Sequence, residues 1–542
     1  MIKKTLVTLM FLVFVLGESP AQNNGDISKL EQVINIISKS YMDTINTRKL
    51  VDEVIRILFE RLDPHTVYRS KDEAKDDFLN RPAFHRGIGM DFRIFDDTMT
   101  VTGVVPRSPA EKAGLRPGTR IAFANGKHVS GSHLKYPEIT DYLSRVYHSG
   151  DSIRLGVIKD KKVKTVAIQP DQIQNNSIES FYAVNDSCIY LKISFFNFNT
   201  GKEFTEAIKT FTKKQTKNII LDLRDNPGGM LTACNEVCTH FFNEGIQIAN
   251  MRSQSAEACK SLFAESGGLL TNSRICVLIN ELSASSSEII AGAVQDWDRG
   301  IIIGRRSFGK GLVQQLFTLE DSSQIRITVS KIHTPSGRCI QKEYKTSGFN
   351  KYNGEIISRR LRGENTDKNK IPIAENTASF YTIKLHRKIY PGLGIIPDVF
   401  VPEDTVSVPA FWQSWYTNRA IDNFILSDIN KNRESYSKEF PNFKKFTELF
   451  TPTRKLEREI FEYCQKDTSD CQKISREEFE NFISPLYPAD AEKAVLKQLK
   501  ARYAYFLFGS TEWRKFLNLY DKDFNAALKL INDYEEYQNA FK

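Results

Sequence analysis

Between residues 180 and 335 the sequence alternates short apolar segments with segments of helical periodicity, and this alternation constrains the fold more than any other feature. The apolar segment at 274–279 runs directly into a serine-rich stretch at 280–288. Over 289–297 apolar residues recur on one face of an amphipathic helix. Further apolar segments lie at 219–223 and 300–304. Strands that alternate with helices predict an α/β layered core.

The rest of the chain has patterns of apolar residues that differ from those of this core. Its 542 residues give a prior of three or four domains. Apolar residues recur at helical spacing from residue 27 to 80, with a break at 62–65, whereas the segment after residue 86 has short strand-like runs and tight turns. We predict a multidomain α+β protein. Its parts are a signal peptide at 1–21, a helical N-terminal region at 22–80, a β-rich module at 81–170, an α/β core at 171–405 with a polar surface insertion at 342–380, and a helical C-terminal region at 406–542.

The first residues have the pattern of an export signal. A short basic leader, Met1 to Lys4, precedes an apolar run of about a dozen residues, which is too short to span a bilayer comfortably. Small residues at Ser19 and Ala21 then suit cleavage before Gln22. We expect an exported protein without a membrane-spanning segment in its mature form. Lys plus Arg exceeds Asp plus Glu by only 75 − 66 = 9, and the charges are interspersed, which argues against a nucleic-acid partner.

The serine-rich stretch is the first candidate for chemistry. Ser285 stands where a strand gives way to a helix, so its hydroxyl can be exposed at the sheet edge while nearby N–H groups face developing negative charge. Ser285 and Glu288 also fit a helix capping box, and this segment alone favours that structural interpretation.

Lys310 adds a second candidate, because it lies between two glycines that allow close backbone approach. A lysine can serve as a general base only if burial lowers its pKa well below about 10.4. Gln314, four residues on, can orient the amine without adding negative charge. The alternative interpretation of Lys310 is an exposed loop lysine.

The β-rich module has its own motifs. The stretch SPAEKAGLRPGTRIAFANGKHV at 108–129 resembles a PDZ domain over roughly 86–170. A glycine-containing loop precedes it, and such a loop can converge backbone N–H groups on an anion. The PDZ resemblance implies that this loop binds a C-terminal peptide carboxylate, with a solvated role for Arg86 equally open. The peptide-binding candidates are Arg86, Gly87, Ile88, Gly89 and Met90.

Taken together, the motifs resemble the C-terminal processing (tail-specific) peptidases of the S41 serine peptidase group over roughly 45–405. The matching stretches are LDPHTVY at 62–68, LDLRDNPGG at 221–229, SASSSEIIAGAVQD at 283–296, GRRSFGKGLVQQ at 304–315, TPSGR at 334–338 and GIIPDV at 394–399. The resemblance implies a core of the ClpP/crotonase type.

The resemblance also implies the roles of individual residues. Ser285 is the nucleophile, Lys310 the base, and Gln314 the residue that positions the lysine. The N–H of Ser286, where the family usually has alanine, and that of Gly228 or Gly229 form the oxyanion hole, the choice between the two glycines being open. No metal or other cofactor is implied.

The function expected from these features is that of a serine endopeptidase acting on exported proteins with exposed C-terminal tails. The family suggests the periplasm, with the outer surface or the extracellular space left open, and a homo-oligomer also stays open. One alternative is a catalytically silent PDZ-bearing adaptor or chaperone. Another is a Ser-His-Asp hydrolase using His240 or His333, although no Gly-x-Ser-x-Gly elbow occurs. No His-Glu-x-x-His motif supports a metallopeptidase, and Cys234 and Cys238 are interpreted as packing residues rather than metal ligands.

Overall fold

The computed structural model describes residues 24–75, 84–95, 98–130, 136–159, 162–212, 218–345, 348–374, 377–406, 408–466, 472–484 and 489–542. The predicted signal peptide lies outside these residues. The chain forms two compact units, one made of residues 1–74 and 316–327 and the other of residues 75–315 and 328–542. In the described part of the chain, no helix combines the length and apolar character needed to cross a membrane.

The smaller unit contains two helices, α1 (Asn24–Ser40) and α2 (Thr47–Glu60), and a short strand, β1 (Val67–Arg69). Asn46 caps α2 by accepting a hydrogen bond from the Lys49 backbone N–H. After α2 the Asp63 carboxylate accepts the N–H groups of His65 and Thr66, which fixes the predicted break as a turn. Beyond the turn, β1 pairs with β18 (Gln324–His333) and α3 (Lys71–Lys75) follows. The helical prediction did not anticipate β1, because its pairing partner is distant in sequence.

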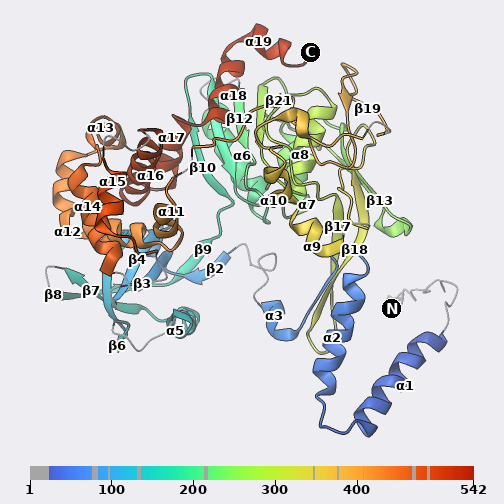
Figure 1. Ribbon diagram of the computed structural model, residues 1–542, viewed down its shortest axis with the longest axis horizontal. Coiled ribbons are helices and arrows are strands. Elements are labelled where there is room, and N and C mark those ends of the chain that lie inside the picture. Colours follow the sequence, from blue (N-terminus) through green and yellow to red (C-terminus); the bar gives the residue numbers. More distant parts are fainter. Residues whose placement is uncertain are drawn as a thin grey trace, which may run out of the picture. The chain divides into compact units, whose positions relative to one another are not determined.

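In the larger unit, residues 84–174 form a small β-rich region (Figure 1). Five strands are ordered β3-β4-β5-β7-β8, with β6 (Lys127–His128) on β5, so that β3 lies at an edge. Their bounds are β3 (Met90–Phe95), β4 (Thr98–Val104), β5 (Arg120–Ala124), β7 (Ile153–Lys159) and β8 (Lys162–Ile168). The strands enclose a separate hydrophobic core with α4 (Pro109–Lys112) and α5 (Tyr136–Ser149), and β2 (Phe84–Gly87) pairs with β9 (Asp171–Gln174).

A six-stranded sheet, ordered β10-β11-β12-β15-β16-β21, forms the centre of the larger unit. All its pairings are parallel except that of β10 with β11. Its strands are β10 (Ile178–Ala183), β11 (Cys188–Ile193), β12 (Asn218–Asp222), β15 (Arg274–Ile279), β16 (Ile301–Gly304) and β21 (Val399–Phe400). The apolar segments at 219–223, 274–279 and 300–304 are thus confirmed as buried strands, and they are apolar throughout because both faces of the sheet are covered.

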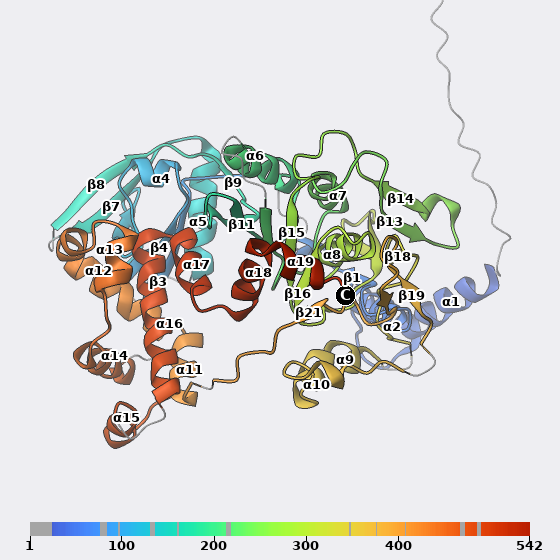
Figure 2. The same cartoon turned by 90° about the horizontal axis from the view of Figure 1, so that it is seen from above.

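Two layers of helices cover the sheet. Alternate strand residues such as Ile219 and Val277 pack against α6 (Thr200–Thr212), α7 (Leu231–Thr239) and α8 (Ser286–Asp296). The intervening residues, such as Ile220 and Cys276, pack against α18 (Lys522–Asn532) and α19 (Tyr534–Asn539) at the end of the chain (Figures 1 and 2). The last helices therefore belong to the same hydrophobic layer as the central sheet, although more than 200 residues separate them from β15.

The remaining C-terminal residues are helical, as predicted for 406–542. They pack around a core that includes Trp412, Trp415 and Tyr503. The helices are α11 (Ala410–Thr417), α12 (Ala420–Glu439), α13 (Phe443–Leu449), α14 (Arg454–Lys466), α15 (Arg476–Phe482), α16 (Ala489–Phe508) and α17 (Ser510–Asn518).

A second sheet in the larger unit contains β13 (Gln247–Arg252) and β14 (Lys260–Phe263), and β17 (Leu312–Thr318) pairs with β18. The segment predicted as a polar surface insertion differs from that expectation. It contains α9 (Gly348–Asn353) and α10 (Glu355–Leu361), and several of its charged side chains are buried.

Candidate active site

Ser285 lies in the turn between β15 and α8, and its backbone conformation is unusual. Its φ of 54° and ψ of −114° fall in a region that residues other than glycine rarely adopt. The Ser285 N–H donates to Oε2 of Glu288 at 2.9 Å, which is one half of the predicted capping box. The residue itself is partly exposed, whereas the helix that follows is buried along its whole length.

The neighbouring serines have their hydroxyl groups bonded to backbone carbonyls. Ser283 Oγ donates to the carbonyl of Leu223 at 2.8 Å. Ser286 Oγ donates to the carbonyl of Gly229 at 2.9 Å, and Ser287 Oγ donates to that of Asn226 at 3.0 Å. These bonds join the serine turn to the loop that follows β12. The Ser286 hydroxyl, which an alanine at this position would lack, therefore has a structural contact.

The loop at 226–229 approaches the serine turn closely because both follow parallel strands and so end at the same sheet edge. Gly228 has a φ of +96°, and a Cβ added there would lie 2.7 Å from the Cβ of Ser285 and 3.0 Å from the Ser286 nitrogen. No side chain fits at that position. The Gly228 N–H donates to Oδ1 of Asn226 at 2.8 Å.

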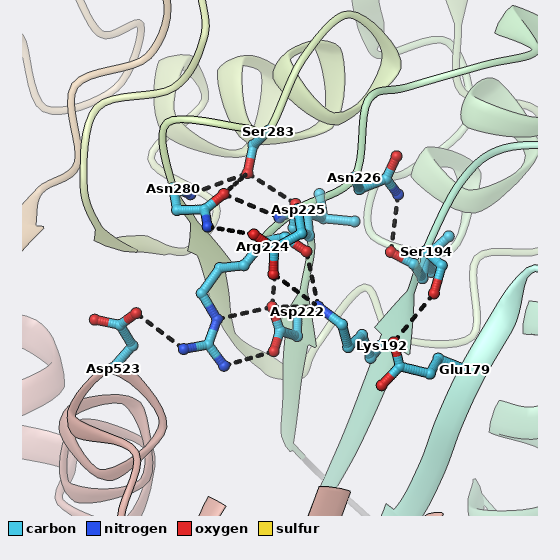
Figure 3. Close-up of polar contacts among 12 residues, drawn as sticks. Glu179, Lys192, Ser194, Asp222, Arg224, Asp225, Asn226, Asn280, Ser283 and Asp523 are labelled. Atoms are coloured by element: carbon cyan, nitrogen blue, oxygen red, sulfur yellow. Dashed lines mark hydrogen bonds and ion pairs between the residues drawn. The ribbon is translucent and has the colours of Figure 1, made fainter. Parts of the chain in front are cut away.

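Buried charges hold the base of this loop (Figure 3). Arg224 binds Asp222 at 2.6 Å and reaches α18 to bind Asp523 at 2.9 Å. The Lys192 ammonium donates to the Arg224 carbonyl at 2.7 Å. Burial alone would raise the pKa of Asp222, but the charges of Arg224 and Lys192 hold that pKa below its usual range. On the other side of the loop, Asn280 accepts the Asp225 N–H at 2.9 Å.

Glu288 connects the turn that carries Ser285 to the loop that carries Lys310. Its Oε2 accepts both the Ser285 N–H, at 2.9 Å, and the Lys310 N–H, at 2.8 Å. Its Oε1 accepts the Gly309 N–H at 2.7 Å and the Ser307 hydroxyl at 2.6 Å. Burial raises the pKa of the Glu288 carboxyl, and these donors oppose that rise. Sequence reasoning recognised Glu288 only as a helix cap, since nothing near it in sequence reveals its bonds to residues 307–310.

Lys310 and Gln314 lie at the start of the next strand. Lys310, partly exposed, precedes β17, and Gln314 is on it. The Gln314 side-chain amide donates to the Leu312 carbonyl at 3.1 Å and to the Thr328 hydroxyl at 3.3 Å. The structure therefore brings the backbones of the two catalytic candidates, Ser285 and Lys310, to a single carboxylate oxygen.

A family model and a relative identify the family to which this chain belongs. The model for "Peptidase family S41" matches residues 187–348. The carboxy-terminal-processing protease of Bartonella bacilliformis is 31% identical over 347 residues, which cover 62% of this chain and 78% of the relative. The chain belongs to the carboxy-terminal processing proteases of peptidase family S41. It is thus a serine-type peptidase.

Two further similarities extend the comparison. The carboxy-terminal processing protease CtpB of Bacillus subtilis is 29% identical to this peptidase over 344 residues, covering 60% of this chain and 68% of the relative. Among solved structures, the photosystem II D1 C-terminal processing protease aligns with a TM-score of 0.36 and 20% identity, over 70% of this chain and 88% of that chain. So low a TM-score adds nothing to the sequence evidence.

The two alternative histidine bases of this peptidase have other partners. His240 Nε2 is 2.8 Å from the Thr205 hydroxyl on α6, and the ring lies beside Phe204. Burial lowers the pKa of His240 to about 4. His333 is on β18, where its Nδ1 lies 3.3 Å from the Lys331 carbonyl. The structure therefore gives no support to a Ser-His-Asp arrangement at Ser285.

The proposed peptide-binding residues precede and begin the edge strand β3. Gly89 has a φ of +76°, and a Cβ there would lie 2.4 Å from that of Ser108. The Arg86 Nε donates to the Tyr147 carbonyl on α5 at 2.8 Å. Gly87 ends β2, Met90 begins β3, and Ile88 is buried between them. The loop is thereby fixed between the edge strand and α5.

The buried cysteines pack as small apolar residues. Cys234 and Cys238 are buried in α7, and the Cys234 thiol donates to the Ser286 carbonyl at 3.3 Å. Across the described ranges, no cluster of three or more His, Cys, Asp or Glu residues is arranged to hold a metal ion. The sequence also allows Cys464 and Cys471 to close a small loop, but Cys471 lies outside the described residues.

Proposed function

We propose that this peptidase cleaves polypeptide chains with Ser285 as nucleophile and Lys310 as general base, and that Gln314 helps to position the lysine. The observation that carries the proposal is the Glu288 carboxylate, which accepts the backbone N–H groups of both Ser285 and Lys310 on one oxygen. Because both N–H groups bind the same oxygen, the backbones of Ser285 and Lys310 lie close together, as those of a nucleophile and its base must.

The choice of Ser285 among the clustered serines rests on hydrogen bonding. The hydroxyls of Ser283, Ser286 and Ser287 each donate to a backbone carbonyl. A hydroxyl that donates its proton to a backbone carbonyl is not oriented to give that proton to a base. Ser285, by contrast, is partly exposed at the start of α8.

The mechanism follows from these positions. Neutral Lys310 takes the proton of the Ser285 hydroxyl as the Ser285 oxygen attacks the peptide carbonyl. The lysine then protonates the departing amine, and a water molecule, again deprotonated by Lys310, releases the acyl group from Ser285.

The N–H groups of Ser286, in the first turn of α8, and of Gly229 stabilise the oxyanion. We prefer Gly229 to Gly228 as the second donor because the Gly228 N–H already donates to the Asn226 side chain.

The β-rich module at 81–170 is proposed to act as a PDZ domain that recognises exposed C-terminal tails. An extended peptide would add to the free side of edge strand β3, with its carboxylate at the loop of Arg86, Gly87, Ile88, Gly89 and Met90. The predicted signal peptide places the enzyme outside the cytoplasm, with the periplasm as the proposed compartment. We further propose that residues 171–405 form a ClpP/crotonase-type core, to which α18 and α19 contribute one hydrophobic layer.

The test compares the mature protein with Ser285→Ala and Lys310→Ala, each given an unfolded protein with an apolar C-terminal tail. Lys202→Ala is the control, since that lysine is exposed on α6. We expect cleavage by the parent and control only. An active-site fluorophosphonate should label Ser285, as identified by mass spectrometry. Retained cleavage by Lys310→Ala, or labelling at another serine, would reject the mechanism. Tail binding without cleavage by the parent would favour the adaptor alternative.

A further inference from the structure

The segment that follows the TPSGR motif, 342–374, contains charged side chains in an environment where charges are costly. Arg359, Glu364 and Lys342 are only 1%, 2% and 4% exposed, respectively. Removing charges from water costs several kcal/mol per ion unless they are paired and hydrogen-bonded. A segment selected only to cover a surface would not need them.

The Arg359 guanidinium binds the backbone of the loop that carries Lys310. Its Nη1 donates to the carbonyl oxygens of Ser307, at 2.7 Å, and Arg306, at 3.3 Å. Its Nη2 donates to the carbonyl of Phe308 at 3.1 Å. These are three consecutive carbonyls, and they immediately precede Gly309 and Lys310. The planar fork of arginine suits such an array, whereas an ammonium group cannot span it.

Other residues of the segment support the same contact. The Lys342 N–H donates to the Gly309 carbonyl at 3.0 Å, so the next carbonyl in the loop is also bonded to the segment. Glu355 pairs with Arg359 at 2.9 Å and with Lys342 at 2.9 Å. Glu364 holds Arg306 through both carboxylate oxygens, at 2.6 and 3.0 Å. Each buried charge of the segment therefore has a partner of opposite sign.

The two sides of the loop are thus held by different parts of the chain. Glu288, on α8, accepts the N–H groups of Gly309 and Lys310, while Arg359, on α10, donates to the carbonyls of residues 306–308. The backbone on which Lys310 is mounted is fixed from both directions. A lysine base needs such fixation because any shift of its backbone moves the amine relative to the nucleophile.

We propose that Arg359 is a positioning residue for the peptidase reaction, which holds Lys310 in its working position by binding the carbonyl groups of residues 306–308. This inference rests on the proposed function of Lys310 as the base. It gives Arg359, on the buried side of α10, a part in the catalytic apparatus.

The test measures kcat and KM of Arg359→Gln on a fluorogenic peptide, with rates divided by the folded concentration from circular dichroism. We expect kcat to fall by about 10- to 100-fold, the scale of a misplacement near 1 Å, with KM within about twofold of the parent. The matched control is Arg360→Gln, because the side chain of Arg360 is 67% exposed and pairs with Glu403 rather than with the lysine loop. The control should keep the parental kcat.

The remaining outcomes separate this inference from the proposed function. Arg359→Lys keeps the charge beside Glu355 but cannot bind three carbonyls, so its kcat should also fall. Parental kcat in folded Arg359→Gln, while Lys310→Ala is inactive, would overturn the inference alone. Activity in Lys310→Ala would overturn the proposed function. Failure of both Arg359 variants to fold would overturn the inference too, since Arg359 would then be needed for the fold and not for placement of the base.

Discussion

Replacing Glu288 by glutamine tests whether one buried carboxylate holds the two catalytic loops. Glu288 accepts four hydrogen bonds, from the N–H groups of Ser285, Gly309 and Lys310 and from the Ser307 hydroxyl. A glutamine has one acceptor oxygen and one donor NH₂ group, so it cannot satisfy them all. The best orientation turns the NH₂ group toward the Ser307 hydroxyl, which can accept, and leaves the Gly309 N–H unpaired.

The expected loss of stability follows from the number of hydrogen bonds that are lost or weakened. A buried donor left unpaired costs about 1–3 kcal/mol, and hydrogen bonds to a neutral group are weaker than bonds to a charged one by about 1 kcal/mol each. We therefore expect Glu288→Gln to lower the free energy of unfolding by about 4 kcal/mol and to reduce kcat by at least about 100-fold, since both catalytic loops shift.

Urea unfolding followed by circular dichroism measures the stability, and cleavage of a fluorogenic peptide measures kcat. Glu257→Gln is the control, because Glu257 is exposed in a short 3₁₀ turn. An unfolding free energy within about 1 kcal/mol of the parent, together with an unchanged kcat, would refute the idea that this carboxylate joins the loops.

Three further predictions concern the loop, its buried charges and the segment at 342–374. Gly228→Ala should abolish measurable turnover in a peptide assay, because its Cβ would lie 2.8 Å from a backbone oxygen of the serine turn. The control, Gly245→Ala, has a similar φ of +81° and no atom within 4 Å of the added Cβ, so it should keep the parental turnover. Equal activity of the two variants would disprove the steric argument. Arg224→Met should lower the unfolding free energy by about 3–5 kcal/mol, because the buried Asp222 charge loses its nearest partner and retains the more distant Lys192 ammonium at 3.7 Å; a loss below about 1 kcal/mol would contradict this. Burial alone would raise the pKa of Glu355, but its basic partners lower that pKa from 4.5 to about 2. Its contribution to the free energy of unfolding is therefore fully present above pH 4.5 and is lost as the pH falls toward 2. Glu355→Gln should flatten the dependence of stability on pH in that window, and an unchanged dependence would argue against the pairing.

Much of the framework could be predicted from the sequence because it depends on local patterns. The strand at 274–279, the turn at Ser285 and the helix after it follow from apolar runs, a serine cluster and helical periodicity, all within about 25 residues. The oxyanion candidates at 226–229 follow similarly from a strand and a Gly-rich turn. Such features are encoded by neighbouring residues, so they can be predicted without knowing the tertiary contacts.

The predictions failed where the deciding partner is distant in sequence. Residues 342–380 are polar and weakly periodic, so they resembled a surface insertion, yet Arg359 is buried against carbonyls some 50 residues earlier. Likewise, the end of the chain gave no sign that Asp523 binds Arg224, which lies 299 residues away.

The sequence by itself determined which segments of the central core form strands and helices, which turn carries the serine cluster and which family the motifs resemble. Only the tertiary structure decided that Glu288 joins the loops of Ser285 and Lys310, that Arg359 binds the lysine loop and that α18 and α19 cover the central sheet. The physical reason is that periodicity and turn chemistry act between near neighbours. The pairing of a buried charge depends on which distant groups the packed core brings within about 3 Å of it.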